Sequence, residues 1–303
     1  MSVSLLKLAV PMVLVTMPLI VYSADQKFKF SASAGIEFDD NVSVSTIDQS
    51  TGQSDEALVV DLSASYMAVE SEGKELELAY DFYQSIYNDL TDFNLQIHTL
   101  SALGSWDFET YDTGLNYSYS HTSLGGDRLF DSHTLTPYIG FGGASEAWYH
   151  RVSYGYVDKD FFSNPDRDAT QHSIAVDNYY FFNDSKAYVS MGLRYEDENT
   201  SGPEFDYQGT YVNLGASLPV QVGEWTPTLK ANYKHYWRDY DNVTASIGER
   251  RDDEQDAVTL ELGHPLSKSV RMKLNYEWND TDSNLAAADF EENIVSLVFS
   301  ADF

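Results

Sequence analysis

The C-terminal stretch Asn293-Ile-Val-Ser-Leu-Val-Phe-Ser-Ala-Asp-Phe303 decides the fold. Side chains of an extended strand point alternately to opposite faces, so one face of this stretch is entirely apolar and ends on an aromatic ring. The residues of that face are Val295, Leu297, Phe299, Ala301 and Phe303. A last strand of this kind predicts an outer-membrane β-barrel, and we expect it to carry the signal that the barrel-assembly machinery recognises.

The same alternation of apolar and polar residues recurs from Lys27 to Phe303. Clusters of Gly, Asp, Asn, Ser or Pro, which favour turns, bound the alternating segments. About fourteen strands are predicted, at residues 27–38, 57–69, 74–86, 93–107, 111–121, 132–142, 147–157, 170–182, 186–196, 206–218, 225–239, 256–264, 269–279 and 293–303. Two of them are irregular. The apolar face changes near His98, which indicates a bulge or a miscounted strand. Pro137 lies inside a predicted strand and has no backbone N–H to donate to the ladder.

The lengths of the connections favour a barrel over a soluble sandwich, in which strands alternate equally well. Connections from odd to even strands are long and acidic, at 39–56, 158–169, 240–255 and 280–292, whereas those at 70–73, 183–185 and 265–268 are tight. This alternation of long and short connections is typical of barrels with extended outer loops and short periplasmic turns. The predicted fold is all-β: an antiparallel, up-and-down transmembrane barrel with extracellular acidic loops.

The N-terminus predicts export. Lys7 precedes an apolar run over residues 8–22, and the small residues Ser23 and Ala24 follow. This is the layout of a cleavable secretory signal, while Pro11 and Pro18 argue against a membrane anchor. We expect residues 1–24 to be a signal peptide and 25–303 to form one barrel in the outer membrane of a Gram-negative bacterium.

Composition excludes several classes of function. The chain contains no Cys, so disulfides, thiolate metal sites and a cysteine nucleophile are absent. The formal net charge of -30 excludes an electrostatic binder of nucleic acid, because phosphate neutralisation needs clustered Lys and Arg. No cofactor is predicted. The expected partners are outer-membrane lipid and lipopolysaccharide.

Four stretches resemble a known family: Gly35 to Val42, Arg194 to Glu198 together with Glu204 to Tyr207, Leu262 to Lys268, and Leu274 to Asn284. They are similar to the barrel half of the surface lipoprotein assembly modifier family and to related exopolysaccharide-export porins. Members of that family usually carry an N-terminal tetratricopeptide domain credited with periplasmic contacts. Here the first strand begins a few residues after the signal, so the resemblance implies a barrel without that domain, acting alone or with a separate periplasmic export partner.

Alternation places charged side chains inside the predicted barrel. The basic residues come from the second half of the chain: Arg151, Arg194, Lys230, Lys234, Arg238, Arg271 and Lys273. The acidic ones come from the first half: Glu37, Asp61, Glu75, Glu77 and Asp81. Opposed walls of charge would orient charged or dipolar solutes. The alternative is that these ions pair with neighbouring strands and fill the interior.

Metal and catalytic signals are weak. Asp280, Asp282, Asn284 and Glu291 match part of a calcium loop, but Leu285 occupies the position that requires Gly. We therefore expect no metal site. His121, near Ser120, Ser123 and Asp127, is the one local cluster suited to a hydrolase. Since histidine beside serine in a polar loop is a common accident, we expect no enzyme and no catalytic residues.

The sequence therefore favours an outer-membrane pore or translocation conduit, for solutes or for export of a surface polymer or lipoprotein. The alternative is a structural or adhesive surface barrel, with a plugged lumen and acidic loops that bind ions. A lipid-directed enzyme is the third class, and it would depend on His121.

Overall fold

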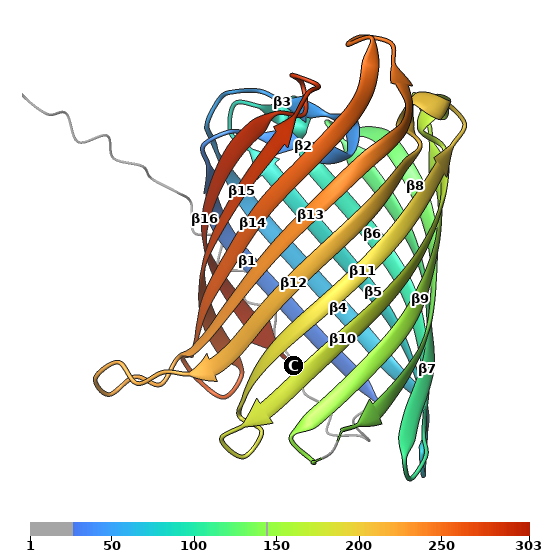
Figure 1. Cartoon of the computed structure of the whole chain (residues 1–303). Helices are drawn as coiled ribbons and strands as arrows, with labels where there is room; N and C mark the ends of the chain where they lie inside the picture. Colours follow the sequence, from blue (N-terminus) through green and yellow to red (C-terminus); the bar gives the residue numbers. More distant parts are fainter. Residues whose placement is uncertain (1–26, 144) are drawn as a thin grey trace, which may run out of the picture.

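The computed structural model describes residues 27–143 and 145–303, and the predicted signal peptide therefore lies outside the described residues. Fourteen strands form one closed antiparallel barrel, as predicted (Figure 1). They are β1 Phe28–Asp39, β4 Asp55–Ser71, β5 Lys74–Tyr87, β6 Leu95–Asp107, β7 Tyr111–Leu124, β8 Asp127–Gly142, β9 Trp148–Phe161, β10 Ala169–Phe182, β11 Ala187–Thr200, β12 Tyr207–Pro219, β13 Thr228–Thr244, β14 Glu249–Pro265, β15 Val270–Ser283 and β16 Phe290–Asp302. In the described ranges, no helix is long and apolar enough to cross a membrane.

The first and last strands close the ring. Ala32 of β1 pairs with Ala301 of β16 on one side and with Leu62 of β4 on the other. At the end of the seam, the amide of Phe303 donates to the carbonyl of Phe30 at 2.9 Å. Closure satisfies the backbone groups that a sheet edge would leave open to lipid. We call the end of the barrel at which β1 begins and β16 ends the terminal end, and the opposite end the loop end.

The barrel is apolar outside and polar inside. Leu274 pairs directly with Leu262 and with Leu297, so all three side chains share the outer face. Leu274 is 47% exposed and Phe299 46% exposed, whereas the carboxylate-bearing Glu196 is 2% exposed. A soluble sandwich would bury the first two. The apolar face of the C-terminal strand therefore points outward, as a lipid-facing strand requires.

A belt of tyrosines surrounds the outer face. Six of these tyrosines form a hydrogen bond between their hydroxyl and a polar side chain on the next strand. In each case the polar residue lies two positions before the residue that pairs directly with the tyrosine. The pairs are Tyr80–His98, Tyr117–His133, Tyr154–His172, Tyr195–Gln208, Tyr233–Asp256 and Tyr276–Asn293. One pair comes from each hairpin that turns at the loop end, apart from the β1–β4 connection. Rings with a satisfied polar tip favour a membrane interface, so the belt marks that level.

The strands run further toward the loop end than the alternation indicates. β13 and β14 stay paired out to Thr244 and Glu249, so the predicted loop at 240–255 is mostly a hairpin. β9 likewise continues to Phe161. The sequence predicts shorter strands here because both faces of each strand become polar beyond the membrane. The backbone hydrogen bonds between the strands nevertheless continue.

One connection at the terminal end is longer than predicted. β13 begins at Thr228, and residues 220–227 form a hairpin that projects from the barrel (Figure 1), with a bridge between Val222 and Trp225. The turn at 183–185 is tight, as predicted, and all three of its residues have φ between 53° and 61°.

The predicted bulge near His98 is wrong. β6 keeps one register with both neighbours, so Leu95 and Ile97 face the interior. Register shifts occur instead in the β4–β5, β7–β8 and β13–β14 pairs. Pro137 does interrupt a ladder: β8 and β9 pair up to Leu135 and resume at Tyr138.

Candidate functional site in the lumen

The strand register places all twelve predicted lumen charges on the face opposite the apolar belt. Their neighbours differ, however. Glu37 and Asp61 line one cavity of about 380 Å³. Lys234 and Arg238 line another cavity on a different part of the wall. The interior therefore has chemically distinct sides.

The acidic side is formed by strands β1, β4, β5, β15 and β16. Glu277, which the sequence argument did not select, joins Glu37 and Asp61 around the 380 Å³ cavity. Behind them, Asp39 is 1% exposed and accepts a hydrogen bond of 3.1 Å from the hydroxyl of Tyr87. Negative charge thus extends over these adjacent strands, with the predicted lumen cations of β15 among them.

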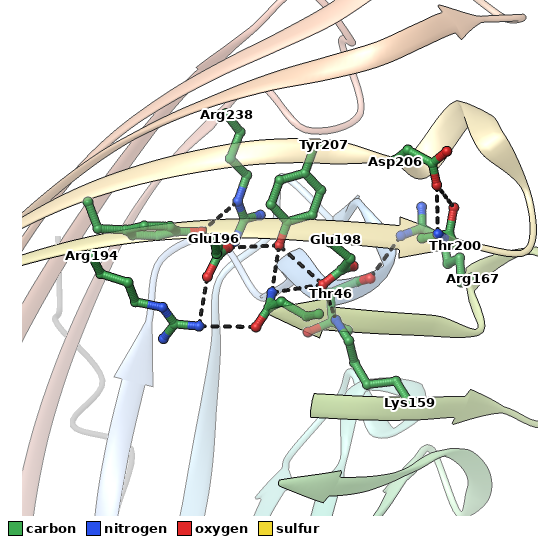
Figure 2. A network of polar contacts seen from close by, with 12 residues as sticks. Thr46, Lys159, Arg167, Arg194, Glu196, Glu198, Thr200, Asp206, Tyr207 and Arg238 are labelled. Carbon is green, nitrogen blue, oxygen red and sulfur yellow. Dashed lines mark hydrogen bonds and ion pairs between the residues drawn. The ribbon is translucent and has the colours of Figure 1, made fainter. Parts of the chain in front are cut away.

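The opposite side contains a dense network centred on Glu196 of β11 (Figure 2). Its carboxylate accepts hydrogen bonds from the hydroxyls of Tyr207, at 2.9 Å, and Tyr211. Arg194 pairs with the same carboxylate at 2.7 Å. Charge-assisted contacts of this number fix a buried carboxylate in place.

Arg238 of β13 completes this side. Its Nε donates to the hydroxyl of Tyr211 at 2.9 Å, and its guanidinium lies 3.9 Å from Glu196. The guanidinium also lies over the rings of Tyr207 and Tyr236, with centroid distances of 4.7 and 4.6 Å. The cation is therefore held between aromatic faces and a carboxylate.

The network continues to β9 and β10 through Glu198. Lys159 donates to Glu198 at 2.7 Å, and Gln171 donates to the same carboxylate at 2.9 Å. Arg194 in turn donates to Gln171 at 3.0 Å. One polar system thus links five consecutive strands, β9 to β13.

The connection between β1 and β4 folds over the mouth at the loop end. It contains β2 Ser43–Val44, β3 Gln49–Ser50 and the 3-10 turn η1 Ser45–Ile47 (Figure 1). Asp48 follows η1 with φ of 54° and pairs with two arginines, Arg167 and Arg251. We call this contact the Asp48 latch. Burial alone would raise the pKa of Asp48, but the hydrogen bonds and charges of Arg251 and Arg167 outweigh it and hold the pKa below its ordinary value of 3.8.

Arg251 fixes the latch to the barrel wall. Its side chain is 5% exposed and pairs with Asp48 at 2.8 Å and with Asp253 at 2.7 Å. Asp253 is itself 1% exposed and accepts a hydrogen bond of 2.6 Å from Ser283. The first connection therefore spans from β1 and β4 to β14 instead of extending into solvent.

The partial calcium loop does not form. Asp280 and Asp282 lie within β15, not in a loop. The side-chain oxygen of Asn284 accepts the amide of Asp252 at 3.1 Å, and Glu291 accepts the indole N–H of Trp278 at 2.9 Å. Among the described residues, no group of three or more His, Asp or Glu is arranged to hold a metal ion.

The histidine cluster forms with one of its expected partners, Ser123, and with Asp131 in place of Asp127. His121 contacts Asp131 at 2.5 Å and Ser123 at 3.4 Å on the outer face. Ser120 points to the lumen and hydrogen-bonds with Thr99, and Asp127 begins β8. Proximity in the chain favours Asp127 as the partner of His121, whereas the pairing of β7 with β8 brings Asp131 to it.

The lumen residues that the sequence argument missed are chiefly Glu196 and Glu198. They share strand parity with Arg194, so the alternation that selected Arg194 also selects them. A wall predicted from its cations alone leaves these two acids out. In the structure, acids and bases alternate there.

Comparisons with known proteins agree with this architecture. The family described as surface lipoprotein assembly modifier matches residues 28–303. None of the curated proteins compared with the chain matches it. Among solved structures, an anion-selective porin from Comamonas acidovorans aligns with a TM-score of 0.54 and 12% identity, over 91% of this chain and 98% of that one.

Two further solved structures show the same fold. OmpT, an outer membrane protein of Vibrio cholerae, aligns with a TM-score of 0.53 and 9% identity, over 91% of this chain and 97% of that one. CdiB from Acinetobacter baumannii aligns with a TM-score of 0.51 and 8% identity, over 92% of this chain and 60% of that one. At such identities the likeness concerns the fold alone, which is that of an outer-membrane barrel. The family match covers every strand of the barrel, so the chain belongs to the surface lipoprotein assembly modifier family.

Proposed function

We propose that this protein is a gated outer-membrane conduit that passes a charged solute, or a segment of a surface polymer or lipoprotein, across its charge-divided lumen. The observation that carries the proposal is the separation of the acidic cavity around Glu37 and Glu277 from the network around Glu196 and Arg238. A field between two such sides orients a dipolar or charged cargo during passage. The family match supports a cargo connected with surface lipoproteins.

The orientation follows from the connections. In this proposal residues 1–24 direct export, the terminal end faces the periplasm, and the latched mouth faces outward. The C-terminal strand, with its outward apolar row ending at Phe303, presents the assembly signal to the barrel-assembly machinery. Cargo reaches the terminal end from a separate periplasmic partner.

The Asp48 latch acts as the gate. It joins the first connection to Arg167, in the turn after β9, and to Arg251 on β14, so it constrains three parts of the mouth at once. Ion pairs hold the connection over the lumen, and their release widens the outer mouth. No bond in the cargo is broken in this mechanism.

The test is ion selectivity in planar lipid bilayers. Replacing Lys230, Lys234 and Arg271 with Glu should shift the reversal potential in a salt gradient toward cation selectivity. A control with the same change in net charge replaces Lys186, Arg250 and Lys268, which are exposed in turns and at the hairpin end. Its reversal potential should match that of the unmodified protein. Equal reversal potentials for all three proteins would refute the lumen-field mechanism.

The second candidate function is a structural or adhesive surface barrel. The observation that favours it is the latch itself, together with the network of β9 to β13, because both reduce the open cross-section. Conductance separates the two functions. A bilayer that stays silent with both the unmodified protein and Asp48→Asn would favour the scaffold, and ion passage through the variant would favour the conduit.

A further inference from the structure

A Ser–His–Asp arrangement lies on the lipid-facing side of β7 and β8. Asp131 accepts a hydrogen bond of 2.5 Å from Nδ1 of His121. On the other side of the ring, Nε2 of His121 lies 3.4 Å from the Oγ of Ser123. The carboxylate assigns the proton to Nδ1, which leaves the Nε2 lone pair to accept the serine hydroxyl. Catalytic hydrogen bonds are often this long without substrate and shorten when it binds.

Three features of the strands create the arrangement. His121 and Ser123 are two positions apart on β7, so both point outward. His121 pairs directly with Asp131 on β8. The register shift between Thr122 and Ser123 comes next, and bulges of this kind re-aim a side chain near a site.

The cluster lies at the edge of the apolar band. On β7 the outward residues from Tyr111 to Tyr119 are mostly apolar or aromatic. This stretch spans about 26 Å of strand and, at a tilt of about 40°, about 20 Å of bilayer. Because Tyr117 belongs to the tyrosine belt, His121 and Ser123 lie just beyond the belt toward the loop end. We infer from this position that the cluster faces the headgroup region of the outer leaflet.

Neighbouring side chains form a surface suited to a lipid. The ring of Phe162 meets His121 edge-on at 6.1 Å between centroids, and the guanidinium of Arg128 lies 3.8 Å above the same ring. Arg128 also pairs in register with Ser123. An apolar wall and a cation therefore flank the serine, and the cation suits a phosphate group or a developing oxyanion.

We propose that Ser123, His121 and Asp131 hydrolyse a carboxylic ester of a phosphate-bearing lipid in the outer leaflet. The activity goes beyond the conduit function and needs neither the lumen nor the latch; it uses the outward orientation of the loop end. The substrate chemistry is an O-acyl ester close to a phosphate. Phospholipid and the lipid part of lipopolysaccharide both provide it.

The reaction balances with water as the only co-reactant. Oγ of Ser123 attacks the ester carbonyl carbon while His121 Nε2 takes the hydroxyl proton; the carbonyl C–O bond to the alcohol breaks, and the alcohol leaves with that proton. Water then attacks the acyl-serine, His121 accepts a proton from it, and Ser123 regains a proton as the fatty acid departs. Asp131 is a positioning residue that holds the ring and stabilises its charged form.

The test measures fatty acid release and serine labelling with the full, folded chain. The unmodified protein is mixed with phosphatidylglycerol vesicles in one arm and with purified lipopolysaccharide in the other, and released fatty acids are identified by mass spectrometry. A long-chain sulfonyl fluoride is applied separately to locate a modified serine. We expect release in one arm, which names the lipid source, and labelling at Ser123.

Variants separate catalysis from structure. Ser123→Ala should abolish both release and labelling. Asp131→Asn should slow release by about 10⁴-fold, as loss of the orienting carboxylate does in serine hydrolases, and change its pH profile, while Asp131→Glu restores part of it. Ser120→Ala, a neighbouring serine that faces the lumen, should keep full activity. Conductance should remain unchanged in Ser123→Ala, so failure here is distinguishable from failure of the conduit. Folded protein that releases no fatty acid in either arm and leaves Ser123 unlabelled would overturn the proposal.

Discussion

Arg251 on β14 donates a hydrogen bond of 2.8 Å to Asp48, although 203 residues separate them in the chain. The contact exists because the barrel closes, which brings the connection after β1 to the wall formed by the later strands. Arg251 also holds Asp253, so the latch is attached to a fixed point of the wall. If the latch gates the mouth as proposed, Asp48 is the residue to change.

Asp48→Asn should open the mouth. The substitution keeps the shape of the side chain but removes the charge that faces Arg167 and Arg251, which weakens the contact by about 1–3 kcal/mol. Mean single-channel conductance and the open fraction should both rise in planar bilayers. Asp241→Asn, an exposed acid at the same end, is the matched control and should leave both unchanged. Unaltered conductance of Asp48→Asn would remove the gate from the mechanism.

The latch should also open in acid. Since its two arginine partners hold the pKa of Asp48 below 3.8, the latch contributes its full stability above pH 3.8 and loses it as pH falls through the lowered pKa. Conductance should therefore rise only at a pH below 3.8. The measurement is a pH titration of single-channel conductance. Asp48→Asn should lack the rise, and an identical rise in both proteins would assign it to other groups.

Glu196→Gln should destabilise the barrel. The carboxylate is 2% exposed and faces Arg194 and Arg238, so neutralising it leaves two cations without their common partner. Removing one member of a buried ion pair costs about 3–5 kcal/mol. Urea unfolding in lipid vesicles, followed by tryptophan fluorescence, measures the loss. Glu224→Gln, in the exposed hairpin at the terminal end, serves as the control, and equal stability of the two variants would contradict the role of Glu196.

Alternation predicted the strands well because the membrane imposes a consistent apolar face on each of them. β5, predicted at 74–86, spans Lys74–Tyr87. Alternation no longer marks a strand where it extends beyond the lipid. For this reason β14 is predicted to begin at residue 256 but begins at Glu249. Alternation also fails at β6, where Leu95 and Ile97 contribute apolar side chains to the lumen side and imitate a bulge.

Parity predicted the lumen side chains but not their partners. The inward direction of Arg194 follows from its strand, whereas its pairing with Glu196 and Gln171 depends on side-chain reach and on the neighbouring strand. The Asp48 latch is harder to predict, because the sequence of an acidic connection does not indicate which strands of the barrel wall it contacts. The same holds for Asp131, which reaches His121 only through the pairing of β7 with β8.

The ring of Phe303 should matter for assembly more than for stability. Its backbone closes the seam with Phe30, and its side chain is 48% exposed at the terminal end. Phe303→Ala keeps the backbone hydrogen bonds and removes an exposed ring, so unfolding in vesicles should change little. If the assembly machinery reads that ring, the amount of heat-modifiable barrel in the outer membrane of expressing cells should fall. Phe28→Ala removes another exposed ring, 62% exposed, from the first strand and should assemble normally. Equal loss in both variants would show that assembly responds to terminal aromatic surface in general and not to the last residue.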